Sequence, residues 1–175
     1  MLMNKVSKLG QIANFVCYIA LQLVVARFVA FGHTALCFVY VSFLLLLPRQ
    51  QTGLAFILLI SFGVGLLVDI FYHSIGVHAF ASVLMVYSRA ILLQRMLPAS
   101  SYEVAAQPTV GNLGWRRFSL FSLVLISIHH VALFLLEAGS AMLFFVVMRK
   151  VVLSTLLTYA AVLATQGIVL LAKRS

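Results

Sequence analysis

The sequence predicts an all-helical integral membrane protein, folded as a compact bundle of six transmembrane helices. Its 175 residues are 64% hydrophobic and only 9% charged, with a mean hydropathy of +1.16. Soluble domains are about half apolar and about a quarter charged, and a soluble chain of this length has too little interior to bury so many apolar side chains. The composition excludes a soluble enzyme, a disordered chain and a secreted disulfide scaffold. We expect a single polytopic membrane domain over residues 1–175.

Apolar stretches along the chain set the positions of the expected helices. A helix needs about 20 residues to cross the hydrocarbon core of a bilayer. The expected spans are 12–31, 34–47, 53–72, 75–97, 118–136 and 151–172, of which the second is short. Runs such as 43–47 lack the alternation of a membrane strand, so the spans are expected to be helical. The apolar segment 138–148 is too short to cross alone, and we interpret it as a re-entrant piece, an interfacial helix or an extension of the last span.

The basic residues predict the orientation in the membrane. Twelve Lys and Arg stand against three acids, and they come singly or in pairs between apolar runs, which favours membrane topology over nucleic-acid binding. With six spans, the cytoplasmic side would hold Lys5, Lys8, Arg49, Arg95, Arg116, Arg117, Lys173 and Arg174. The outer side would hold only Arg149 and Lys150. Both termini and the loop 98–117 are therefore predicted to be cytoplasmic.

Two opposite charges lie at matching depth within the expected spans. Arg27 is four residues before the outer end of the first span, and Asp69 is three residues before the outer end of the third. Charge inside a membrane is costly, so it is usually paired or functional. Either the two side chains form a buried pair, or each extends separately to the outer headgroups.

All five histidines and two of the three acids fall in the outer half under this topology. His130 and Glu137 share a helix face, and His78 begins the fourth span. His78, His130 and Glu137 are candidate polar or partner-contact residues. We favour a structural hydrogen-bond cluster over a metal site, because adjacent histidines such as His129 and His130 point about 100° apart. No metal or other cofactor is expected.

Small residues mark expected helix-packing faces, because missing side chains let helix backbones approach closely. They cluster on the third span and at the start of the fourth, and they repeat along the last span. The candidates are Gly63, Gly65, Gly76, Ser154, Thr158 and Ala161. Gly76 also suits a tight turn.

Catalytic patterns are missing from the sequence. It contains no paired carboxylates, no nucleophile elbow and no phosphate-binding glycine loop, so we expect a protein that is not an enzyme. Cys17 and Cys37 lie in apolar stretches and are interpreted as reduced, small hydrophobic residues.

Several motifs resemble the bacterial rod-shape-determining membrane protein family MreD. They are Gly-Val-Gly-Leu-Leu-Val-Asp at 63–69, Ile-Gly-Val-His-Ala at 75–79, Ile-His-His at 128–130, Leu-Phe-Leu-Leu-Glu at 133–137 and Leu-Ser-Thr at 153–155. Further similarity includes Pro98, Tyr102-Glu103, Pro108, Leu113-Gly114 and Arg117. The resemblance covers most of the chain after about residue 45.

The resemblance implies a non-enzymatic multi-pass subunit of the cell-elongation complex in the bacterial cytoplasmic membrane. Its partner would be MreC, with MreB, RodA and the elongation transpeptidase in the wider complex. The family is also similar in fold to the six-helix substrate-capture subunits of energy-coupling-factor vitamin transporters. The alternative is accordingly a membrane subunit that binds a vitamin-like small molecule, and a membrane enzyme ranks last.

Overall fold

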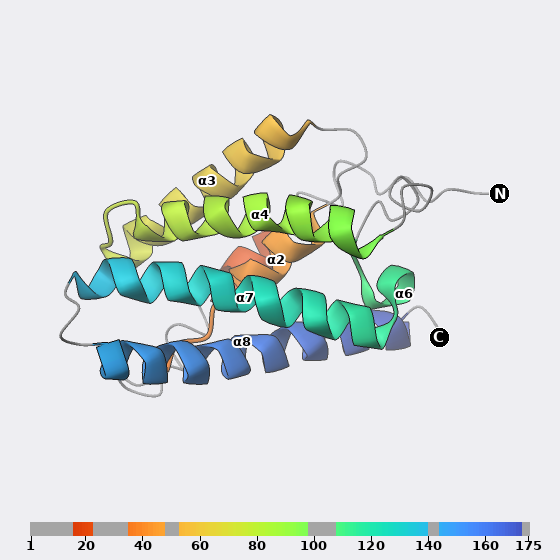
Figure 1. Ribbon diagram of the computed structural model, residues 1–175. Coiled ribbons are helices and arrows are strands. Elements are labelled where there is room, and N and C mark those ends of the chain that lie inside the picture. The colour runs from red at the N-terminus through yellow and green to blue at the C-terminus, as the bar shows by residue number, and fades with distance from the viewer. Residues whose placement is uncertain (1–15, 23–34, 48–52, 98–107, 140–143, 173–175) are drawn as a thin grey trace.

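The computed structural model describes residues 16–22, 35–47, 53–97, 108–139 and 144–172 (Figure 1). Residues 16–22 are helical. The other helices are α2 (Tyr40–Leu46), α3 (Leu54–Tyr72), α4 (Val77–Met96), α6 (Val110–Leu113), α7 (Trp115–Ala138) and α8 (Phe144–Ala172). Within these described ranges, α3, α4, α7 and α8 are long and apolar enough to cross a membrane.

The four long helices pack side by side in the order α3, α4, α7, α8, and the short α2 lies behind them (Figure 1). Each of them runs antiparallel to its neighbour in this row. The described core combines apolar side chains, including Phe118, Phe121, Leu125 and Ile126 of α7, with a set of buried polar side chains such as Asp69 and His130. Since lipid cannot satisfy backbone polar groups, this helical row is the arrangement that the composition demands.

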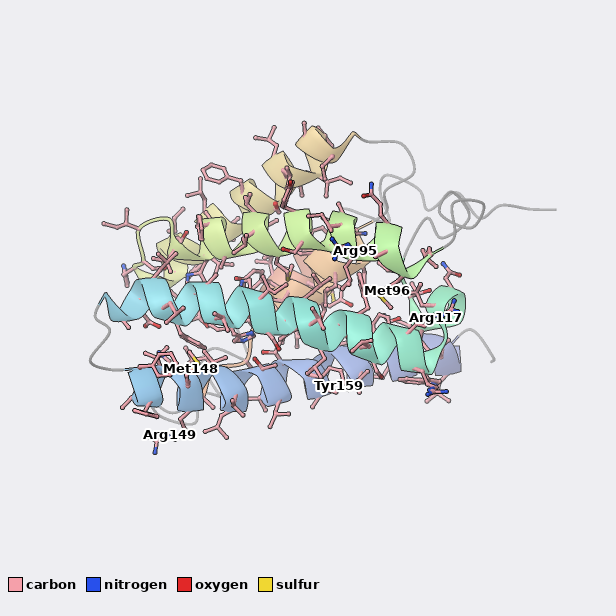
Figure 2. The ribbon with its side chains drawn as sticks, in the orientation of Figure 1. Arg95, Met96, Arg117, Met148, Arg149 and Tyr159 are labelled. Carbon is pink, nitrogen blue, oxygen red and sulfur yellow. The ribbon has the colours of Figure 1, made fainter. Side chains whose placement is uncertain are left out.

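The bundle has two chemically different ends, visible in Figure 2. We call the end that holds the α3–α4 turn, the end of α7 and the start of α8 the histidine end. The opposite end holds the last turn of α4, α6 and the first turn of α7, and we call it the arginine end. Figure 2 shows Arg149 at the first of these and Arg95 and Arg117 at the second.

Four predicted spans lie on long helices of the structure, and three of these helices have nearly the expected length. The spans 53–72 and 75–97 correspond to α3 and α4, and 118–136 corresponds to α7, which starts three residues earlier at Trp115. The span 151–172 is the later part of α8, whose 29 residues extend about 43 Å. Because α8 starts at Phe144, the described part of the apolar segment 138–148 extends the last span on one side and α7 on the other. Of the first predicted span, 12–31, only residues 16–22 lie within the described residues.

The prediction of a helix over 34–47 was wrong. Residues 35–38 are extended, and only the seven residues of α2 are helical, a length of about 10 Å. This segment is buried, with Phe38, Tyr40, Val41 and Leu44 inaccessible to solvent. Non-helical backbone is tolerated at membrane depth only where protein or a water-filled cavity surrounds it. The described part of this predicted span is therefore non-helical backbone followed by a short helix, and the sequence of 35–47 contains no Gly or Pro that indicates it.

Candidate functional site

The α3–α4 hairpin is built around a very close contact between backbones. A Cβ on Gly65 would lie 2.4 Å from the Cα of Ala79 and 2.7 Å from the carbonyl oxygen of His78. No residue but glycine fits there without moving the α4 backbone. Gly65 therefore lies at a close approach of two helix backbones, which is the position that its predicted packing role calls for.

Asp69 joins the end of α3 to the start of α4. Its backbone oxygen accepts hydrogen bonds from the N–H groups of His73 and Ser74, which close α3 through the left-handed conformation of His73 (φ 53°). Its carboxylate oxygens accept the N–H groups of His78 at 2.9 Å and Ala79 at 3.1 Å. These are the second and third residues of α4, the donors that an N-cap side chain normally satisfies. The actual N-cap, Gly76, has no side chain, so Asp69 caps α4 from the preceding helix.

The side chain of His78 completes this junction. Its Nδ1 lies 2.9 Å from Asp69 Oδ1, and Ser74 donates its hydroxyl to the same oxygen at 2.6 Å. An ionised carboxylate can only accept, so His78 carries its proton on Nδ1. The His78 and Asp69 side chains are 6% and 4% exposed, and the pair is therefore shielded from solvent.

The extended segment before α2 is held by side chains of neighbouring helices. The N–H of Leu36 donates to Ser154 Oγ at 2.9 Å, and the N–H of Phe38 donates to Thr158 Oγ1 at 3.1 Å. Ser154 and Thr158 lie one turn apart on α8 and are fully buried. The small-residue stripe predicted on the last span thus packs inside the protein, where its hydroxyls replace the missing helical hydrogen bonds.

Gln22, in the helical segment 16–22, holds the same segment from the other side. Its Nε2 donates to the carbonyl oxygen of Cys37 at 3.2 Å and to the Tyr72 hydroxyl at 3.1 Å. Its Oε1 accepts the N–H of Tyr40 at 3.3 Å. At the other end of α2, the buried guanidinium of Arg89 donates to the backbone oxygen of Leu47. One backbone group at each end of α2 is therefore bonded by a side chain.

A chain of hydrogen bonds leads from this segment to α7. His130 Nδ1 lies 2.8 Å from the backbone oxygen of Ile126, which can only accept, so this nitrogen carries the proton. The other ring nitrogen of His130 then accepts from the Thr158 hydroxyl at 3.4 Å. The Thr158 hydroxyl thereby accepts a hydrogen bond from the N–H of Phe38 and donates one to Nε2 of His130.

Phe38 lies at the centre of a cluster of rings. Its ring centroid is 5.4 Å from those of His78 and His130 and 6.0 Å from that of His129. Tyr40 lies against the same cluster, and its hydroxyl is 2.7 Å from His129 Nε2. The extended segment and α2 thus bring three histidines, from α4 and α7, around one aromatic side chain.

Some polar atoms of this cluster have no hydrogen-bond partner among the described residues. They include His78 Nε2 and His129 Nδ1, both in side chains that are at least nine-tenths buried. Such groups cost free energy when unsatisfied. A crevice nearby, lined by residues such as Gln22, Val68 and Tyr72, has a volume of about 10 Å³, which is the size of about one water molecule.

The candidate residues from the sequence do not all come together. Asp69, His78 and His130 belong to the buried cluster. Glu137 does not, because it is half exposed and pairs with Lys150 at 3.0 Å. The proposed partner of Asp69, Arg27, lies outside the described residues, so the Arg27–Asp69 pair stays a prediction.

Two of the predicted packing residues have other surroundings. A Cβ on Gly63 or Gly76 would meet nothing within 4 Å, so neither is a close contact between helices. Gly76 instead provides the left-handed turn (φ 75°) before α4. Ala161 is half-buried on α8.

The hydrogen bonds of His78 and His130 limit the chemistry that the cluster can perform. Ser74 and Asp69 both contact Nδ1 of His78, whereas a serine–histidine–aspartate triad needs the serine on the opposite ring nitrogen. His130 uses both ring nitrogens within the protein, so it has no lone pair for a metal ion. Within the described ranges, no group of three potential ligands could hold a metal. The arrangement is suited to locking helices together.

Sequence reasoning missed the residues that hold the extended segment. Gln22, Tyr40 and Arg89 are polar groups within apolar stretches, and that position was the available signal. Phe38 gave no signal, since one more phenylalanine in an apolar span is unremarkable.

Comparison with known proteins identifies no relative. No protein-family model, no curated protein and no solved structure matches this chain.

Proposed function

We propose that this protein is a non-enzymatic membrane scaffold subunit of the bacterial cell-elongation complex, with the role of MreD. In this role it binds MreC and helps to couple MreB filaments to lateral peptidoglycan synthesis by RodA and the elongation transpeptidase. It would thereby maintain cell shape from the cytoplasmic membrane.

The motif at 63–79 supports the proposal. The glycine, aspartate and histidine that carry the resemblance are the residues that form the α3–α4 junction: Gly65 allows the contact, Asp69 caps α4 and His78 binds Asp69. A motif with this structural basis is suited to a protein whose task is to present a fixed surface to partners. The buried cluster locks helices together, and its serine–histidine contact is made at the same ring nitrogen that contacts Asp69, unlike the arrangement of a catalytic triad.

The first experiment is co-purification. The tagged chain is expressed with the MreC protein of the same genome, extracted in mild detergent and purified by the tag. We expect MreC to co-elute in a fixed ratio through size exclusion. The control is an unrelated tagged six-span protein expressed in the same way. Absence of MreC from the folded, monodisperse protein would contradict the proposal.

The second experiment is genetic. Depletion of the protein in its own host is expected to convert rods to enlarged round cells, and expression of the chain is expected to restore them. Unchanged cell width and length after depletion would contradict a role in elongation, whatever the outcome of the co-purification.

The alternative function is a small-molecule capture subunit of a transporter. One observation favours it: the buried non-helical backbone at 35–38 before the short helix α2, since membrane transporters often build binding sites where the helical backbone is broken. Mass spectrometry of the purified protein separates the two functions. A bound vitamin-like compound together with a co-purifying ATPase module would identify the capture subunit.

A further inference from the structure

The arginine end carries a cluster of positive charge without a counter-charge in the described structure. Arg95 lies in the last turn of α4, and Arg116 and Arg117 lie in the first turn of α7. All three are exposed, and Figure 2 shows Arg95 and Arg117 at the same end of the bundle. Within the part of the chain that the structure describes, none of the three forms an ion pair.

The opposite end provides a contrast. The two described acids, Asp69 and Glu137, both lie at the histidine end. There, Glu137 neutralises Lys150 at 3.0 Å, and Asp69 is enclosed in the α3–α4 junction. Lys150 is thus paired with an acid at the histidine end, whereas Arg95, Arg116 and Arg117 have no acidic partner among the residues that the structure describes.

Arg95 and Arg116 each continue an exposed apolar face of their helix. Ile91 is one turn before Arg95 on α4 and is 39% exposed, and Leu120 is one turn after Arg116 on α7 and is 59% exposed. Residues four apart lie on the same side of a helix. A guanidinium therefore lies at the end of an apolar stripe on both helices, which matches an amphiphile with a charged head and apolar tails.

Trp115 adds a residue that is typical of the membrane interface. It begins α7, next to Arg116, and is half exposed. Tryptophan is enriched where hydrocarbon meets headgroups. Its position indicates that the arginines lie at headgroup level, where lipid phosphates are in reach.

We propose that the arginine end binds the headgroups of anionic phospholipids, with Arg95, Arg116 and Arg117 each contacting a headgroup phosphate and the acyl chains lying against α4 and α7. Charge complementarity selects this occupant, because guanidinium groups bind phosphate oxygens in a bidentate manner. Basic sites between transmembrane helices bind anionic headgroups in this way. The inference is independent of whether the protein binds MreC.

Trp115 is the single tryptophan of the chain, so its fluorescence reports the composition of the lipid around the site. The purified protein is reconstituted in phosphatidylcholine nanodiscs that contain a minor fraction of brominated lipid, either phosphatidylglycerol or phosphatidylcholine. Bromine quenches tryptophan at short range. We expect brominated phosphatidylglycerol to quench several-fold more strongly at equal fraction, and high salt to reduce the difference.

Variants assign the effect to the arginines. Each of Arg95→Gln, Arg116→Gln and Arg117→Gln is expected to lower the preference for the anionic lipid by about fivefold. The matched control is Arg149→Gln, an exposed arginine at the histidine end, which should leave the preference unchanged. Thermal unfolding of each variant checks that it is folded.

Three results would overturn the proposal. The first is equal quenching of the unmodified protein by the two brominated lipids, a measurement that needs no variant. The second is an equal loss of preference in Arg149→Gln. The third is reversal of the quenching by inorganic phosphate at low concentration, which would assign the site to the free anion.

Discussion

Gly65 of α3 leaves room for the backbone of Ala79 in α4, because a Cβ at position 65 would lie 2.4 Å from the Cα of Ala79. The neighbouring Gly63, on the same helix, has nothing within 4 Å of its Cβ position. The two glycines look equivalent in sequence but differ completely in their surroundings. This difference provides a matched pair of substitutions.

Gly65→Ala is expected to destabilise the protein by about 1–3 kcal/mol, since the added methyl group forces two backbones apart. Gly63→Ala should leave stability unchanged within about 0.5 kcal/mol. Thermal unfolding in detergent measures both. Equal effects of the two substitutions would show that the α3–α4 contact is looser than described.

Asp69 should be the most sensitive polar residue of the hairpin. Asp69→Ala leaves the N–H groups of His78 and Ala79 without their acceptor and is expected to cost about 2–3 kcal/mol. The control is Glu137→Gln, which removes the charge from a half-exposed ion pair and should cost less than about 1 kcal/mol. Thermal unfolding again provides the comparison, and a larger effect at Glu137 would contradict the capping role.

Thr158 should be needed for the extended segment before α2. Thr158→Val keeps the shape of the side chain but leaves the buried N–H of Phe38 without an acceptor, at an expected cost of about 1–2 kcal/mol. Thr165→Val is the control, because the Thr165 hydroxyl donates to the Val162 backbone oxygen of its own helix. Hydrogen exchange at Phe38 should rise in the first variant only. Unchanged exchange in Thr158→Val would show that this hydroxyl does not hold the segment.

The long helices were predictable because their apolar stretches are long and their ends carry Gly, Pro or charge. α3, α4 and α7 each match a predicted span within a few residues. The role of Gly65 was also predictable, since small residues in membrane helices indicate close packing. The sequence could not distinguish Gly65 from Gly63, however, because that depends on which side of α3 faces α4.

The non-helical backbone before α2 was not predictable from local sequence. The segment 35–47 is as apolar as a membrane helix, and it lacks a proline or glycine. Its extended backbone is stabilised by Gln22 and by Ser154 and Thr158 of α8. The two α8 residues lie more than a hundred residues after this segment in the sequence. Such tertiary hydrogen bonds override the local helical preference. The partners of Asp69 were likewise hidden, because the cap depends on the geometry of the turn at Gly76.

Orientation in the membrane can be tested at the two ends of the same bundle. The lysine and arginine pattern predicts that the arginine end faces the cytoplasm, as a subunit that connects to MreB filaments would need. Two exposed positions are suited to single cysteines: Ile75 at the histidine end, which is fully exposed, and Gly111 in α6 at the arginine end. Both are introduced after replacement of Cys17 and Cys37. In intact spheroplasts, a membrane-impermeant thiol reagent should label Ile75→Cys and leave Gly111→Cys unlabelled, whereas both should react once the membrane is opened. The two positions lie at opposite ends of the bundle, so labelling of Gly111→Cys alone in intact spheroplasts would establish the opposite orientation. The arginine end would then lie outside the cytoplasm, where it could not contact a cytoplasmic partner.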